Sequence, residues 1–296
     1  MAGLTRESTI PVSETTTAAT PVPEGGTVSA ARVADVLLAV SSHQEPIGVT
    51  ELARILGLSK AVVHRILQSL ESRALLSFDG SARTYEIGPA AVVLGSRALR
   101  DQELRRVALP VLRQLQVATG ETTTVSALVG TSRIYLDQVV SQRELKMMVE
   151  VGRPFPLHAG ASSKAILAFV SPDLREQVLA QALSDLTPQT ITSRAALEDD
   201  LLVVRQRGVA VSRGERQHGA GSIAAPVRDG HGDVVGSLSI CGPINRFTTA
   251  VLRQYAPLVR RSADEVSHLL ARRMNGGGAD GATPGGPDVV ERTVHG

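Results

Sequence analysis

The stretch "LGLSKAVVHRILQSL", residues 56–70, combines an apolar and a polar pattern with one helical period. Its branched aliphatic residues recur at the spacing of one helix face, formed by Val63, Ile66, Leu67 and Leu70. Ser59 is suited to cap the first turn, and Gly57 to end a preceding helix in the left-handed conformation. The opposite face carries Lys60, Ala61, His64, Arg65 and Gln68. We therefore expect a helix with one side packed on a domain and the other left for solvent or a partner.

Two further helices are expected before this stretch. Ser29 is expected to cap the first, whose apolar side carries Val33, Leu37 and Val40. Thr50 is expected to cap a second, short helix that ends at Gly57. Helix, short glycine-containing turn and helix is the helix-turn-helix pattern, whose second helix fits the major groove of DNA.

The residues after the third helix predict a β-hairpin. The stretch "LLSFDGSARTYEIG", residues 75–88, gives two short strands around Asp79-Gly80, with Arg83 beyond the turn. The hairpin would turn the helix-turn-helix into a winged helix. Residues 28–88 hold as many acidic as basic side chains, so net charge does not favour DNA binding. The placement of charge does favour it, because the exposed face from Ser59 to Ser69 contains no acid.

The sequence thus favours DNA binding, and a three-helix unit with only a structural role remains the alternative. The residues expected to read or clamp DNA are Ser59, Lys60, Ala61, His64, Arg65, Gln68 and Arg83.

Composition narrows the remaining classes. The chain has 296 residues, of which 43% are hydrophobic and 20% charged, and its formal charge is +2. This is typical of a globular protein with two domains, and no apolar run is long enough to cross a bilayer. Residues 1–27 lack the apolar core of an export signal, so we expect a cytoplasmic protein. Cys241 is the single cysteine, which excludes an internal disulfide, and the 2% aromatic content disfavours a base-stacking platform.

The chain divides into five expected parts. Residues 1–27 and 273–296 are polar and rich in Gly and Pro, and are expected to be disordered tails. Residues 28–88 form the winged helix-turn-helix, and residues 89–104 a linker helix started by Pro89, which either pairs with a second copy or only connects. In residues 105–272, helices are expected at 105–118, 162–169, 172–183, 194–207 and 248–272, and strands at 122–130, 133–140, 145–152, 209–215, 222–227 and 234–242. This order predicts an α+β domain around an antiparallel sheet.

Two stretches of that domain resemble a binding site. Alternation in 222–227 and 234–242 places small residues on one sheet face, namely Ser222, Ala224, Ser237, Ser239 and Cys241. The other is the core face, with Ile223, Ala225, Val227, Leu238 and Ile240. In "PLHAGASSKAILAF", residues 156–169, Gly160 permits a turn, and the backbone N–H groups of a helix capped by Ser162 could bind a carboxylate or phosphate. Close helix packing and an ordinary capped helix are the alternatives.

The stretches "LSKAVVHRILQSLESRALL" (58–76), "PLHAGASSKAILAF" (156–169) and "RGVAVSRGERQHGAGSIAAPVRDGHGDVVGSLSICGP" (207–243) occur in an order and at separations that resemble the isocitrate lyase regulator (IclR) family of bacterial transcription factors. The resemblance covers about residues 28–272. It implies a winged helix-turn-helix, a linking helix and a C-terminal α+β effector domain similar to GAF folds. It also implies homodimers, often homotetramers, on a palindromic operator, with no cofactor.

The resemblance also implies an effector pocket. Its positions fall on Gly160, Ala161, Ser212, Ala220, Ser222, Ala224, Ser239 and Cys241. The family usually has acids where this chain has Ser212 and Arg213, and larger aliphatics at Ala220 and Ala224, so a bulkier or more negatively charged effector than small keto acids is expected.

The leading interpretation is therefore a transcriptional regulator, taken as a repressor, under the control of an organic acid or related metabolite. A metal-responsive regulator that uses His158, His218 and Cys241 is an alternative, although these residues lack the close spacing of usual ligand pairs. An enzyme with nucleophile and base among His158, Ser162, Ser163 and Cys241 is a weaker one, because no G-x-S-x-G elbow surrounds them.

Overall fold

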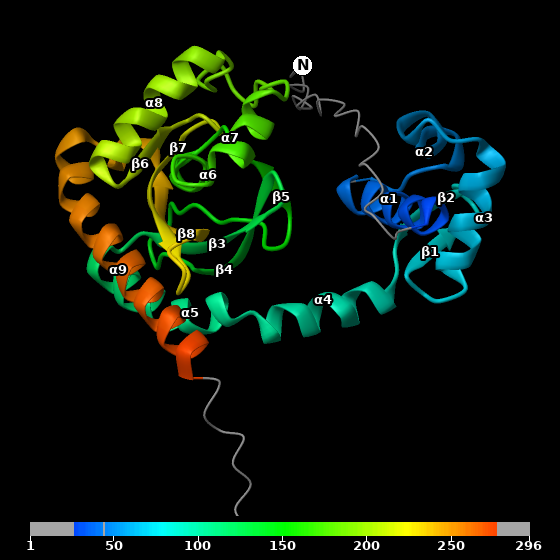
Figure 1. Ribbon diagram of the computed structural model, residues 1–296, viewed down its shortest axis with the longest axis horizontal. Coiled ribbons are helices and arrows are strands. Elements are labelled where there is room, and N and C mark those ends of the chain that lie inside the picture. The colour runs from blue at the N-terminus through cyan, green and yellow to red at the C-terminus, as the bar shows by residue number, and fades with distance from the viewer. Residues whose placement is uncertain (1–26, 44, 277–296) are drawn as a thin grey trace, which may run out of the picture.

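The computed structural model describes residues 27–43 and 45–276. Figure 1 shows a group of helices with a short hairpin, joined through α4 to a larger body built around a sheet. The tails expected at 1–27 and 273–296 lie mostly outside the described residues. Where they are described, the structure differs from the expectation: Thr27 caps α1, and α9 continues through Gly276. In this last part of the helix, Arg273 forms an ion pair of 2.9 Å with Glu103.

The N-terminal group consists of three helices and a hairpin, as expected. The elements are α1 (Val28–Ser42), α2 (Val49–Leu56), α3 (Lys60–Glu71), β1 (Leu76–Asp79) and β2 (Thr84–Ile87). Their common core includes Val36, Leu52, Val63, Leu67, Leu70, Leu76 and Tyr85. On α3 the expected stripe is buried except at Ile66, which is half-buried. Gly57 ends α2 at φ +63°, and Ser59 Oγ accepts a hydrogen bond from the Val62 N–H, as expected.

Two expected helix caps are wrong. Thr27, two residues before Ser29, caps α1 by accepting from the Ala30 N–H at 3.2 Å. Gly48 precedes α2, so Thr50 lies within that helix. The reason for the second shift is a bridge from Ile47 to the hairpin, which fixes the extended backbone just before the helix begins.

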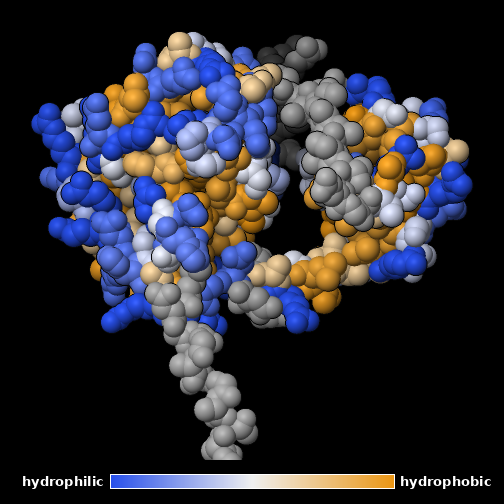
Figure 2. Space-filling view, viewed as in Figure 1, coloured by the Kyte–Doolittle hydropathy of each residue, from blue (hydrophilic) through white to orange (hydrophobic). Residues whose placement is uncertain are grey.

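Helix α4 (Pro89–Asp101) begins at Pro89, as expected, and α5 (Glu103–Thr119) follows it after a break at Gln102. Residues 89–104, predicted as one linker helix, thus form α4 and the first residues of α5. Helix α4 exposes a run of large apolar side chains, Val92, Val93 and Leu94, each more than half exposed. Figure 2 shows this apolar patch on the segment between the two bodies.

The C-terminal body is built on one antiparallel sheet. Its strands are β3 (Thr122–Val129), β4 (Ser132–Val139), β5 (Pro154–Pro156), β6 (Ala210–Arg213), β7 (Ala220–Arg228) and β8 (Val234–Pro243). They lie in the order β5-β4-β3-β8-β7-β6, with every neighbouring pair antiparallel. The chain therefore has a helix-turn-helix unit followed by an α+β domain, as the sequence predicts.

The sheet separates two cores. Helices α5 and α9 (Thr249–Gly276) cover one face, where Ile223, Ala225, Val227, Leu238 and Ile240 are buried, as the alternation predicts. Helices α6 (Ala161–Leu167), α7 (Pro172–Leu179) and α8 (Arg194–Arg207) pack on the other side, with Ala224 in their core. The short 3-10 helix η1 (Ile244–Arg246) follows β8.

The strand expected at 145–152 is wrong. This segment is irregular except for a single bridge between Val151 and Tyr135, and the strand β5 follows it. Side chains take the place of a strand partner: the Gln138 amide bonds both the N–H and the C=O of Val149. The Thr122 hydroxyl likewise donates to the Met147 carbonyl at 2.7 Å. With these backbone groups satisfied, no ladder is needed.

Candidate functional site

A small cavity lies between the small-residue face of β7 and β8 and the start of α6. Every predicted pocket residue except Ala224 lines it: Gly160, Ala161, Ser212, Ala220, Ser222, Ser239 and Cys241. The strand register explains the grouping, because Ser222 lies opposite Cys241, and Ala224 lies opposite Ser239. Ala224 has no exposed surface and belongs to the core under α6. Its methyl group packs against helices instead of facing the cavity.

The start of α6 differs from the expectation. Gly160, at φ +91°, is the residue that precedes the helix, and no side chain caps it. Ser162, the expected cap, lies within the helix and lines the cavity. The Gly160 N–H donates to Glu215 Oε2 at 3.1 Å, so it already has a partner. Glu215, from a segment distant in the sequence, thus satisfies the N–H of the residue that precedes α6, and no side chain caps the first turn.

Arg133 is a pocket residue that sequence reasoning missed. It lines the cavity on β4 and is 1% exposed. Its Nε donates to Ser163 Oγ at 2.8 Å, its Nη1 to Ser126 Oγ at 3.2 Å and its Nη2 to Tyr135 Oη at 3.1 Å. Burial lowers the pKa of Arg133. Strand alternation could have found it, because Arg133 and Tyr135 share a face opposite Ile134 and Leu136.

A second missed arginine, Arg216, is half-buried and also lines the cavity. Its Cζ lies 4.9 Å from the ring centre of Phe155 and 5.8 Å from that of Tyr135. Its Nη2 donates to Gln217 Oε1 at 3.4 Å. Beyond its place in the motif "SRGER", no local pattern marks Arg216, because its neighbours on β4 and β5 are far away in the chain.

The cavity is positively charged and small. No Asp or Glu is among its lining residues. Cys241 stays a neutral thiol, since burial raises its pKa to about 12. The cavity volume is about 20 Å³, which is room for about one water molecule. The arrangement therefore favours an anion, and a ligand larger than water requires the side chains around the cavity to move.

On the N-terminal body, all the residues expected to contact DNA are exposed: Ser59, Lys60, Ala61, His64, Arg65, Gln68 and Arg83. The first six lie at the start of α3 or on its outer face. Arg83 lies in the hairpin turn with φ +57°, a left-handed conformation that is uncommon outside glycine. Asp79 shapes this turn, because its Oδ1 accepts from the N–H groups of Ser81 and Ala82.

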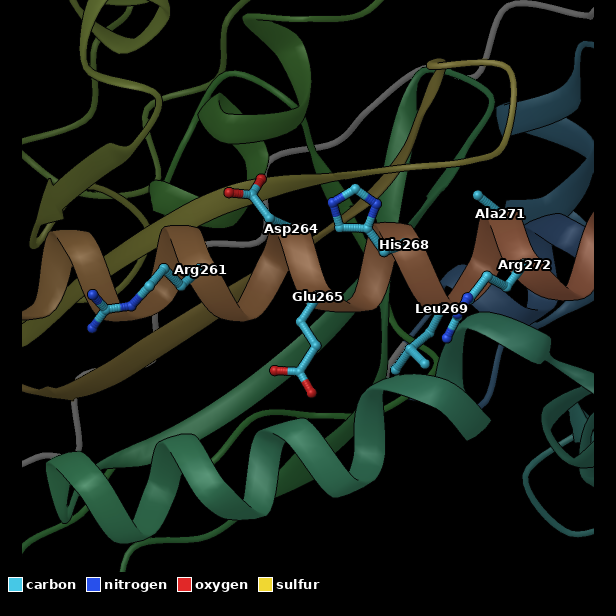
Figure 3. A pocket seen from close by; sticks show the side chains of 7 residues that line it. All are labelled: Arg261, Asp264, Glu265, His268, Leu269, Ala271 and Arg272. Atoms are coloured by element: carbon cyan, nitrogen blue, oxygen red, sulfur yellow. The ribbon is translucent and has the colours of Figure 1, made fainter.

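A larger hollow, of about 930 Å³, lies on α9 and is lined by that helix alone, through Arg261, Asp264, Glu265, His268, Leu269, Ala271 and Arg272. Figure 3 shows these side chains leaving the helix in several directions, without a common focus. They carry both signs of charge. The hollow is therefore an open surface of one helix, and the cavity at α6 remains the candidate ligand site.

The residues of the metal alternative are not brought together, and of those of the enzyme alternative only Ser162 and Cys241 share the lining of the cavity. Within the described residues, no group of three or more His, Cys, Asp or Glu could hold a metal ion. His158 is buried, and its Nε2 donates to the Ser184 carbonyl at 2.9 Å, so it is not paired with Ser162, Ser163 or Cys241. Among the described helices, none is long and apolar enough to cross a membrane.

Comparison with known proteins addresses both bodies. Residues 96–268 match the family described as bacterial transcriptional regulator IclR C-terminal, and residues 29–80 match the IclR helix-turn-helix domain. The HTH-type transcriptional regulator BhcR of Paracoccus denitrificans is 34% identical over 256 residues, covering 86% of this chain and 91% of that protein. The transcriptional repressor IclR of Escherichia coli is 29% identical over 231 residues, covering 77% and 84% of the two chains.

Solved structures give the same result. An IclR-type transcriptional regulator from a Silicibacter species has a TM-score of 0.71 and 30% identity, covering 81% of this chain and 96% of that one. An IclR homologue from Microbacterium hydrocarbonoxydans, complexed with 4-hydroxybenzoate, has a TM-score of 0.63 and 25% identity, with 82% and 98% covered. Since sequence and structure agree over both bodies, this chain belongs to the IclR family of bacterial transcriptional regulators.

Proposed function

We propose that this regulator reads operator DNA with α3 and the β1–β2 hairpin, and that a small organic acid in the cavity at α6 controls the binding. The observation that carries the first half is the charge on α3. Lys60 and Arg65 are exposed, and no carboxylate in the described part of the chain pairs with them. Their charges are therefore available to phosphates and base edges, and the positive end of the helix dipole adds to them.

In the proposed complex, the start of α3 enters the major groove. Arg65 and Gln68 have the hydrogen-bonding groups to contact base edges, while Lys60 and Arg83 contact phosphates. The proposed role is repression, in which the protein bound at its operator blocks transcription until the effector releases it. The name of the Escherichia coli relative, a transcriptional repressor, supports the same role. A regulator of this kind would act in the cytoplasm, where the DNA lies.

The proposed assembly is a homodimer or homotetramer on a palindromic operator. Support comes from α4, whose exposed Val92, Val93 and Leu94 form an apolar surface next to the DNA-binding unit. Pairing of this surface with its copy would bury it and would set the spacing of two α3 helices. Replacement of Val93 by Asp should shift the oligomer toward monomer, as measured by light scattering. The same variant should also bind the operator more weakly.

Arg65→Ala tests the reading face. Operator fragments are first selected from genomic DNA with the wild-type protein, and affinity is then measured by gel-shift titration. We expect a loss of about 1–3 kcal/mol, or roughly a factor of 5 to 150, if Arg65 contacts a base. The control is Arg207→Ala, which removes the same charge from the exposed end of α8 and should leave affinity nearly unchanged. Equal affinities for both variants would contradict the assignment.

A further inference from the structure

Arg133 is a buried cation with no carboxylate partner among the described residues. Its side chain is 1% exposed, and its printed partners are the hydroxyl groups of Ser126, Tyr135 and Ser163. Within residues 27–43 and 45–276, no carboxylate forms an ion pair with it. Hydroxyl oxygens satisfy N–H groups but do not cancel a charge, and an unpaired buried charge is costly. The position is suited to an anion that comes from outside the chain.

Arg216 adds a second charge to the same cavity. The Cζ atoms of Arg133 and Arg216 lie 5.1 Å and 4.9 Å from the Phe155 ring centre, so they are no farther apart than the sum of these distances. The Tyr135 ring packs edge-on against Phe155 at 5.5 Å and contacts both guanidinium groups. The aromatic pair thus holds two cations near each other.

The acid closest in sequence to Arg216 does not neutralise this pair. Glu215 Oε1 lies 2.6 Å from Lys164 Nζ, and its Oε2 accepts from the Gly160 N–H. Since no acid lines the cavity and Cys241 is neutral, the two arginines give it a charge of about +2.

From this we infer that the effector is a short-chain dicarboxylate, with one carboxylate bound by Arg133 at the buried end and the other by Arg216 at the half-exposed end. The inference rests on the proposed control by an organic acid and specifies its class. Arginine has five N–H donors, and the contacts with Ser163, Ser126 and Tyr135 use one on each nitrogen of Arg133. One N–H on each terminal nitrogen remains for a two-point contact with a carboxylate. A monocarboxylate would leave one of the two charges unmatched.

Binding must enlarge the cavity, because its volume of about 20 Å³ cannot hold a dicarboxylate. Two of its boundaries can move at low cost. Arg216 is half-buried at the edge, and Met147 is an unbranched side chain on an irregular segment. The expected entry therefore displaces these two side chains and leaves Arg133 in place.

The test uses the full-length protein and compares each diacid with its own monoamide, which has the same length and one charge less. Malonate, succinate and glutarate are titrated by calorimetry against the corresponding monoamides. We expect at least one diacid to bind tenfold or more tightly than its monoamide, as a charge-assisted contact allows. If no diacid exceeds its monoamide, the inference is overturned.

Variants locate the second charge. Arg216→Gln should reduce the preference for diacid over monoamide to near one. Arg213→Gln, at an exposed position next to Ser212 that does not line the cavity, should retain the preference. A preference that survives in Arg216→Gln would overturn the assignment. Arg133→Met should abolish diacid binding, and if this variant does not fold, Arg216→Gln alone decides.

Operator binding separates this inference from the proposed function. If a monoacid and a diacid of equal affinity both release the selected operator, control by an organic acid stands and the dicarboxylate class is wrong. If the ligand-free protein selects no operator at all, the proposed function itself fails, whatever the calorimetry gives.

Discussion

Lys164 Nζ lies 2.6 Å from Glu215 Oε1, and both side chains are buried beside the start of α6. Lys164 also pairs with Asp200 at 2.9 Å, while Glu215 accepts from the Gly160 N–H. Burial raises the pKa of Glu215, although the charge of Lys164 opposes the shift. This cluster joins α6, α8 and the segment that carries Arg216, so it positions the cavity without lining it.

Glu215→Ala should destabilise the fold more than Glu215→Gln does. Alanine leaves the Gly160 N–H without an acceptor and opens a cavity, for which we expect a loss of about 2–5 kcal/mol. Glutamine keeps an oxygen for that N–H, and Asp200 still pairs with Lys164. Urea unfolding of the two variants measures the difference. Equal losses would mean that the contact with Gly160 contributes nothing.

Gly160→Ala should impair both stability and the cavity. At φ +91° an alanine is strained by about 1–3 kcal/mol, and its Cβ would lie 3.4 Å from Arg216 Cβ. Gly232→Ala is a matched control, because that glycine has φ +88° and no atom near an added Cβ. Thermal unfolding should show a loss in both variants, but only Gly160→Ala should change ligand affinity. Unchanged affinity would show that the contact with Arg216 is easily accommodated.

Stability should fall as the pH drops below the ordinary histidine range, through His158. Burial lowers the pKa of His158 in the folded protein, so the unfolded chain takes up a proton first, near pH ~6.5. The contribution is present above that pH and is lost as the pH falls toward the lowered pKa. His158→Gln should flatten this part of the stability profile in urea titrations, whereas His231→Gln, in an exposed turn, should not. The same slope in all three proteins would contradict the prediction.

Cys241 should be unreactive in the folded protein. Burial raises its pKa to about 12, so little thiolate exists at pH 8. The thiolate is the form that reacts. Iodoacetamide at pH 8 should modify the native protein far more slowly than the protein in urea, as measured by intact mass. Rapid labelling of the native protein would show that the cavity opens often enough to expose the thiol.

Local patterns predicted much of the fold. The stripe on α3, the left-handed Gly57 and the alternation of β7 and β8 depend on residues close in sequence, and the structure has them as predicted. Of the expected pocket residues, which the family resemblance implies, the face alternation places Ser222, Ser239 and Cys241 on the side of the sheet that lines the cavity. It did so because neighbouring antiparallel strands share a fixed register once their hairpin is set.

What the sequence did not predict depends on contacts between distant residues. The Gln138 amide replaces a strand partner for Val149, and Glu215 accepts from the N–H of Gly160 just before α6. Arg133 was overlooked because a basic residue near the start of a strand is usually exposed. Strand alternation indicates the face on which it lies, but its partners come from β3, β5 and α6, which are distant in the sequence. In these three cases the polar group has its partner on another element or segment.

Helix α9 connects the two regions that a signal must join. Near the cavity strands, the Arg228 N–H on β7 donates to Ser267 Oγ on α9 at 2.9 Å. Farther along, Leu270 shares a core with Leu104 of α5, directly after the break at Gln102. A displacement of β7 would thus be transmitted by helix α9 to the C-terminal end of α4. Ligand binding would then act on the DNA-binding unit by changing the angle at which α4 leaves the sheet domain.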